Sequence, residues 1–170
     1  MVVEAVFLLR DPVPAEWKCE KFQAAGRPDL VLKYSKNPDS PRLRILRAEA
    51  FLAMSAPTEA WAEVDMILAV HARPGGVLFT SDWSKKLGDP DADFKSWTGN
   101  RADRDLAMQA AGSLWNGKRS GESLARMRQI SASFPAELEL DYLCYGLARD
   151  LGDSAASARI GLGLARKLTK

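Results

Sequence analysis

The chain has few of the residues that build metal sites, and it has no long apolar run. Its 170 residues include one histidine, His71, and two cysteines, Cys19 and Cys144, which lie far apart and outside any Cys-x-x-Cys pattern. These numbers exclude the zinc patterns that need several Cys and His ligands. No stretch reaches the 18 apolar residues of a membrane span. Both cysteines lie on apolar helical patterns, so we expect reduced thiols in the core, and we predict no metal or cofactor.

Neither sign of charge dominates the sequence. Lys and Arg number 24 against 22 for Asp and Glu, a formal net charge of +2, so no overall field attracts nucleic acid. The apolar start, Met1–Leu9, is interrupted by Glu4 and lacks the basic region and cleavage site of a signal peptide. We therefore expect a cytoplasmic protein. A hydrophobic share of 46% and a charged share of 27% are typical of a globular protein, and the length favours one domain.

Motifs of catalysis are also lacking. No G-x-x-x-x-G-K-[ST] phosphate loop is present, and no G-x-S-x-G motif accompanies His71. Gly161 and Gly163 fall inside an expected helix without a preceding strand, so they do not form a dinucleotide site. We therefore predict that the protein is not an enzyme. A small enzyme centred on residues 73–104 is the third alternative.

What the sequence does contain is helical periodicity. Apolar residues recur at spacings of three and four, for example Leu143, Leu147 and Leu151. Helix-breaking segments divide the chain into hairpins at residues 24–28, 36–41, 55–58, 117–121, 133–135 and 151–154. Thr58 and either Asp153 or Ser154 are expected N-caps. The predicted fold class is all-α, with residues 1–170 forming a single helical-repeat domain.

Residues 73–104 interrupt the periodicity, and we predict an irregular insertion there. The parts of the domain are then an N-terminal segment 1–14, first hairpins 15–70, the insertion, and last hairpins 105–168. Within the insertion, Gly88–Phe94 carries alternating aspartates. A calcium loop needs Gly and Glu where this chain has Phe94 and Asn100, so we expect a solvated acidic turn.

A fixed interval of twelve residues separates small side chains in successive helices. The pairs are Ala48 with Ala60, Ala111 with Ser123, Gly146 with Ala158 and, more loosely, Cys19 with Val31. Small residues at this interval let the two helices of a hairpin cross closely. On these residues the chain resembles the tetratricopeptide repeat, whose period is about 34 residues. Arg44 and Arg149 depart from it, because the family pattern has aromatic residues there. The resemblance implies a right-handed superhelix with a concave groove for a partner polypeptide.

The register implied by the resemblance gives the groove-facing residues. They are Arg42, Ile45, Glu49, Leu52, Met108, Trp115, Leu143, Leu147 and Asp150. We expect an apolar strip with charges at its ends, which binds an apolar helix or peptide of a partner. The predicted function is a non-catalytic protein–protein interaction module: a chaperone, adaptor or assembly factor. The segment Val2–Leu9 could fill the groove until a partner displaces it. The strip could instead be core, and that alternative stays open.

A nucleic-acid-binding helical protein is the alternative function. Aromatic residues alternate with lysines in the insertion, and a second basic cluster spans residues 118–128. The residues concerned are Phe79, Trp83, Phe94 and Trp97 in the insertion, and Lys118, Arg119, Arg126 and Arg128 in the cluster. Such groups can form a stacking platform for single strands. The aromatic residues could equally pin a long loop to the body, and the basic ones could form a solvated face.

Overall fold

The computed structural model describes residues 13–71, 88–117 and 120–169, and these contain nine α-helices and no strand. The helices are α2 (Ala15–Ala24), α3 (Pro28–Tyr34), α4 (Pro41–Ala53), α5 (Pro57–His71), α6 (Pro90–Gly99), α7 (Arg104–Asn116), α8 (Gly121–Ser133), α9 (Leu138–Asp150) and α10 (Ser154–Leu168). The all-α prediction is therefore confirmed for the described part of the chain.

Helix boundaries fall at the predicted breaks. Proline is the first residue of α3, α4, α5 and α6, where the helix needs no backbone N–H. Asp153 caps α10, since its carboxylate accepts from the backbone N–H of Ala156 at 2.9 Å. The prediction for Thr58 is wrong, because α5 begins one residue earlier at Pro57 and Thr58 lies inside the helix.

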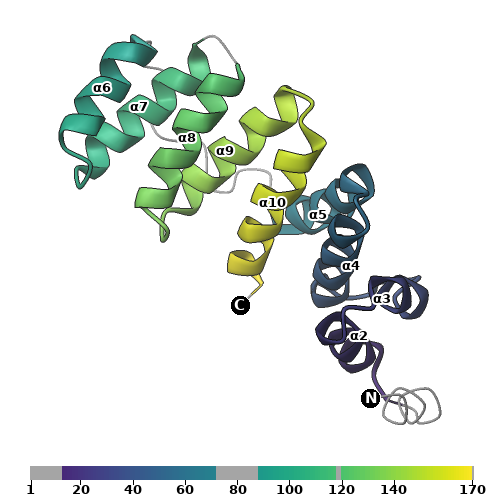
Figure 1. Ribbon diagram of the computed structural model, residues 1–170. Coiled ribbons are helices and arrows are strands. Elements are labelled where there is room, and N and C mark those ends of the chain that lie inside the picture. The colour runs from purple at the N-terminus through teal and green to yellow at the C-terminus, as the bar shows by residue number, and fades with distance from the viewer. Residues whose placement is uncertain (1–12, 72–87, 118–119, 170) are drawn as a thin grey trace.

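The order of the helices in space differs from their order in the sequence (Figure 1). Helices α2 to α5 follow one another along an elongated row, but the next helix is α10, followed by α9, α8 and α7, with α6 at the far end. The contact between α5 and α10 is the most extensive one between two helices. A stack in the order of the sequence would place α6 beside α5. Instead, the last helix lies in the middle of the row.

A glycine permits the close packing of α10. A Cβ atom on Gly161 would clash with Cγ1 of Val64 in α5 and would lie 2.7 Å from Cε2 of Tyr145 in α9. Both neighbours are buried, and neither has room to move. Leu162 and Leu164 belong to the same apolar cluster as Val64 and Tyr145. The beginning and the end of the chain thus share one core.

An ionic cluster joins α4 to its neighbours. Glu63 of α5 is nearly buried and accepts from Arg44 at 3.0 Å and from Arg47 at 2.7 Å. The Arg47 guanidinium also donates to the backbone oxygen of Ser35 at 2.6 Å. Two guanidinium groups therefore compensate one carboxylate that has left water, as a buried charge requires. Arg44, which stands where the repeat pattern has an aromatic residue, holds the α4–α5 hairpin by charge.

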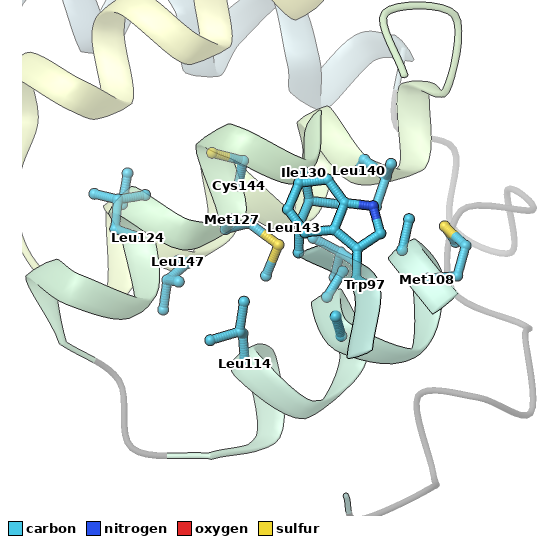
Figure 2. Close-up of a cluster of buried hydrophobic side chains, with 14 residues drawn as sticks. Trp97, Met108, Leu114, Leu124, Met127, Ile130, Leu140, Leu143, Cys144 and Leu147 are labelled. Carbon is cyan, nitrogen blue, oxygen red and sulfur yellow. The ribbon is translucent and has the colours of Figure 1, made fainter. Parts of the chain in front are cut away.

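The predicted irregular insertion is helical in its described part, which corrects the sequence interpretation. The Asp89 carboxylate accepts from the backbone N–H groups of Asp91, at 2.9 Å, and Ala92, at 3.3 Å, and so caps α6. The alternating aspartates therefore begin a helix. Trp97 of α6 is fully buried in a cluster with residues of α7, α8 and α9 (Figure 2). Helix α6 thus covers the end of the row, while residues 72–87 lie outside the described part.

Gly161 and Gly163 provide a matched test of the α10 packing. We expect Gly161→Ala to destabilise the protein by about 1–3 kcal/mol, because an overpacked core must shift. Gly163 has no atom within 4 Å of its would-be Cβ. We therefore expect Gly163→Ala to stabilise the protein by about 0.5–1 kcal/mol through helix propensity. Urea denaturation followed by circular dichroism measures both changes, and equal shifts would contradict the packing.

Trp97 tests whether α6 is part of the core. We expect Trp97→Ala to cost about 3–5 kcal/mol in the free energy of unfolding, as for other buried large-to-small substitutions. Trp17 is 42% exposed. Trp17→Ala is therefore the control, with an expected cost under about 1 kcal/mol. Thermal denaturation distinguishes the two, and a small effect at Trp97 would mean that α6 is detached in solution.

Candidate functional site

The apolar residues of the predicted groove strip are largely buried, which corrects the sequence interpretation. Met108 is 4% exposed, Leu143 is 1% exposed and Leu147 is fully buried. All three pack in the cluster that contains Trp97 (Figure 2). These three residues therefore belong to the core, which was the alternative left open by the sequence. Helix α6, which was not predicted from the sequence, contributes Trp97 to the same core cluster.

The predicted groove residues of α4 face other helices of the same chain. Arg42 pairs with Glu20 of α2 at 2.6 Å. Glu49 accepts from Gln23 of α2 at 3.2 Å and from Arg166 of α10. Ile45 and Leu52 are half-buried against the cluster that contains the α5 and α10 core residues. These contacts hold the helical row together.

The remaining predicted groove residues lie elsewhere. Trp115 is half-buried, and its ring occupies the space that Gly146 leaves without a side chain. Asp150 is exposed at the end of α9. The structure therefore does not bring the nine predicted residues onto one surface. The segment Val2–Leu9, predicted to fill the groove, lies outside the described residues.

A different groove lies between α5 and α9, with a cavity volume of about 380 Å³. We call it the α5–α9 groove, and its lining consists of Asp65, Met66, Leu68, Ala69, Tyr142, Tyr145 and Arg149. Its two walls are some eighty residues apart in the sequence and meet only because α10 brings α9 towards α5. Sequence reasoning missed this groove because helical periodicity gives no information on contacts at that separation.

Tyr145 forms the fixed part of the α5–α9 groove. Its hydroxyl donates to the carboxylate of Asp65 and accepts from Nε1 of Trp61 at 3.0 Å, so α9 is joined to α5 by a polar chain. Tyr142 lies edge-on to its ring, with the centroids 6.3 Å apart. Burial raises the pKa of the Tyr145 phenol, and the hydrogen bond to Asp65 raises it further. The phenol therefore stays neutral and keeps its donor role.

The rim of the groove combines apolar exposure with a positive charge. Met66, which lines the groove, is 52% exposed, and Val70, four residues later on the same helix but outside the lining, is 75% exposed. Across the groove, Arg149 is exposed, and within the described part of the chain its guanidinium has no hydrogen-bond or ion-pair partner. Tyrosine, methionine and arginine are enriched where proteins bind other proteins. The sequence signal that could have indicated this rim is Met66 on the polar side of α5.

The described residues also include the two cysteines of the chain. Both cysteines are free and buried, as predicted, and burial raises the pKa of Cys144 to about 12. Among residues 13–71, 88–117 and 120–169, no three His, Cys, Asp or Glu side chains gather as metal ligands. In the same ranges, no helix has the length and apolar character needed to cross a membrane.

Three residues of the nucleic-acid alternative, Trp97, Phe94 and Arg126, make contacts within the protein. Trp97 is buried in the core, and the guanidinium of Arg126 lies over the Phe94 ring, 5.1 Å from the ring centroid, in a cation–π contact. Arg126 also pairs with Asp91 and, at 2.6 Å, with Glu122. These aromatic residues thus pin the segment to the body. Phe79, Trp83, Lys118 and Arg119 lie outside the described residues.

No protein-family model matches the chain. Comparison with curated proteins and with solved structures likewise finds no match. The fold and the α5–α9 groove are therefore the features of the molecule from which a function can be inferred.

Tyr145→Phe tests the polar chain. Removing the hydroxyl leaves Asp65 and Trp61 without this partner, at an expected cost of about 1–3 kcal/mol. The raised pKa also predicts a pH effect. The unfolded phenol ionises near its ordinary pKa of 10.0 while the folded one stays protonated, so this stabilisation is full below pH 10 and falls above it.

Urea denaturation at pH 8 and pH 11 measures both effects. We expect Tyr145→Phe to be less stable than the wild type at pH 8 and to lose less stability between the two pH values. Tyr142→Phe is the control, because it keeps the Tyr145 hydroxyl and should retain the wild-type loss. An unchanged pH dependence in Tyr145→Phe would argue against the assignment.

Proposed function

We propose that this chain is a non-catalytic protein-binding module that holds an amphipathic helix of a partner in the α5–α9 groove. The observation that carries the proposal is that one preformed groove is lined by a half-exposed methionine, Met66, and by Arg149, for which the described residues supply no hydrogen-bond or ion-pair partner. Such a module would act as a chaperone, adaptor or assembly factor. Its binding surface is then the α5–α9 groove in place of the strip expected from the sequence.

The groove indicates the chemistry of the partner helix. Met66 lines the groove and the exposed Val70 lies one turn further along α5, beyond the lining, so a helix that extends past the groove could place apolar side chains at spacings of three and four residues against both. Methionine is flexible and adapts to the shape of what it contacts. The carboxylate of Asp65 is already engaged by Tyr145, whereas Arg149 is uncompensated among the described residues. The expected ligand therefore carries an apolar stripe beside an Asp or Glu that pairs with Arg149.

The resemblance to the tetratricopeptide repeat supports the proposal through individual hairpins. Helices α4 and α5 pack together, as do α9 and α10. The predicted crossing residues Ala48, Ala60 and Ala158 are fully buried. Cys19 donates its thiol to the backbone oxygen of Val31 at 3.7 Å, so the fourth pair also meets. The small-residue spacing is compatible with the hairpins of that family, whereas the order of the helices along the row departs from a serial stack.

Two half-exposed methionines, Met66 in the groove and Met54 outside it, allow a matched test of the binding surface. A display library of amphipathic helical peptides is selected on the wild-type protein, and the affinity of an enriched peptide is measured by fluorescence anisotropy. We expect enriched peptides to combine an apolar stripe with Asp or Glu. Met66→Lys and Arg149→Glu should each weaken binding on the order of tenfold, about 1.4 kcal/mol.

Met54→Lys is the control, because Met54 of the α4 C-terminus is 51% exposed against 52% for Met66 and lies outside the groove. It should bind the peptide as the wild type does. Circular dichroism verifies that the helical content of each variant is unchanged. If no peptide is enriched, or if Met54→Lys weakens binding as much as Met66→Lys, the groove is not the binding surface.

A further inference from the structure

A second cavity, of about 220 Å³, lies where α8, α9 and α10 meet. We call it the α8–α10 pocket, and its polar lining is Arg128 and Ser131 of α8, Asp141 and Cys144 of α9, and Arg159 and Lys167 of α10. It shares no residue with the α5–α9 groove. Its chemistry is therefore argued separately from the proposed function.

One carboxylate in the pocket is fully engaged. Asp141 accepts from the hydroxyl of Ser131 at 2.5 Å through one oxygen and from the ammonium of Lys167 through the other. Lys167 also donates to the backbone oxygen of Pro135 at 2.8 Å. Asp141 and Lys167 thus neutralise each other and fix the wall between α9 and α10.

Two guanidinium groups in the pocket remain uncompensated. Arg128 and Arg159 are both exposed, and neither has a hydrogen-bond or ion-pair partner within the described part of the chain. Arg126, two residues from Arg128, is by contrast paired with two carboxylates. The pocket therefore has an excess of two positive charges, supplied by two different helices. Guanidinium groups bind carboxylate and phosphate oxygens in pairs, with defined geometry.

The floor of the pocket is apolar and unreactive. Leu164 is fully buried and Ile160 half-buried, and the Cys144 thiol is 1% exposed. Burial raises the pKa of Cys144 to about 12, although the nearby Arg128 lowers it, so the sulfur is a neutral packing atom. Among the described residues, no aromatic side chain lines the pocket, so they offer nothing on which a nucleobase could stack.

We propose that the α8–α10 pocket binds a small organic dianion, with Arg128 and Arg159 holding the charged oxygens and the apolar floor contacting a short carbon body. Phosphate monoesters and dicarboxylates share this chemistry. The two arginines belong to different helices, α8 and α10, and both line the pocket, so the proposal assigns one charged end of the ligand to each.

Isothermal titration calorimetry at fixed ionic strength tests the pocket with two probes, glycerol 3-phosphate and succinate. Binding of one probe with a stoichiometry of one per chain, and none for the monoanion acetate, is expected, and the probe that binds identifies the acid class. Arg128→Gln and Arg159→Gln should each weaken binding at least tenfold. Arg42→Gln, which removes an ion-paired arginine far from the pocket, should leave binding unchanged.

The proposal is overturned if neither probe saturates, or if binding persists in both pocket variants. It is also overturned if Arg42→Gln weakens binding as much as they do, because that would show attraction by general charge. Both arginine side chains are exposed, so the variants are expected to fold, and circular dichroism confirms it. Peptide binding by the α5–α9 groove is measured in the same variants. It should remain intact, so failure of one site is distinguishable from failure of the other.

Discussion

Close packing of α10 against α5 and α9 is the constraint on which the rest of the structure depends. It requires a residue without a Cβ at Gly161, because Val64 and Tyr145 occupy the space that a side chain would need. The consequence reaches well beyond one contact. Helix α10 occupies the position beside α5 that a stack in the order of the sequence would give to α6, so the C-terminal helix lies in the middle of the row. Both the α5–α9 groove and the α8–α10 pocket exist because of that closure.

The local structure could be predicted from the sequence, whereas the order of the helices could not. Helix ends depend on residues within a few positions of them, so they could be predicted correctly. Examples are the proline that begins α3, α4 and α5, and the glycine that follows α2 and α9. Periodicity also identified Leu143 and Leu147 as one apolar face. It could not say what covers that face, because the covering Trp97 lies in a segment whose helix is short and begins at an aspartate cap.

The pairing of charged side chains was the least predictable property, because it too depends on which distant helices meet. Glu49 pairs with Arg166, and Asp141 pairs with Lys167. The partners are too far apart in the sequence for any local pattern to predict the pairing. Sequence reasoning grouped Arg126 with Arg128 as one basic cluster. The structure divides them, since Arg126 is neutralised by Asp91 and Glu122, while Arg128 faces the α8–α10 pocket. Which charges remain available for a ligand is thus decided by the tertiary fold.

Helix α9 supplies residues to both sites from different faces. Tyr142, Tyr145 and Arg149 line the α5–α9 groove, and Asp141 and Cys144 line the α8–α10 pocket. A change that displaces α9 or α10 must therefore disturb both sites at once, so a substitution such as Gly161→Ala reports on the scaffold and on neither ligand. Only exposed side chains at each rim, whose removal leaves the core intact, separate the two binding properties. The helical array is in this sense one structural unit that carries two chemically distinct surfaces.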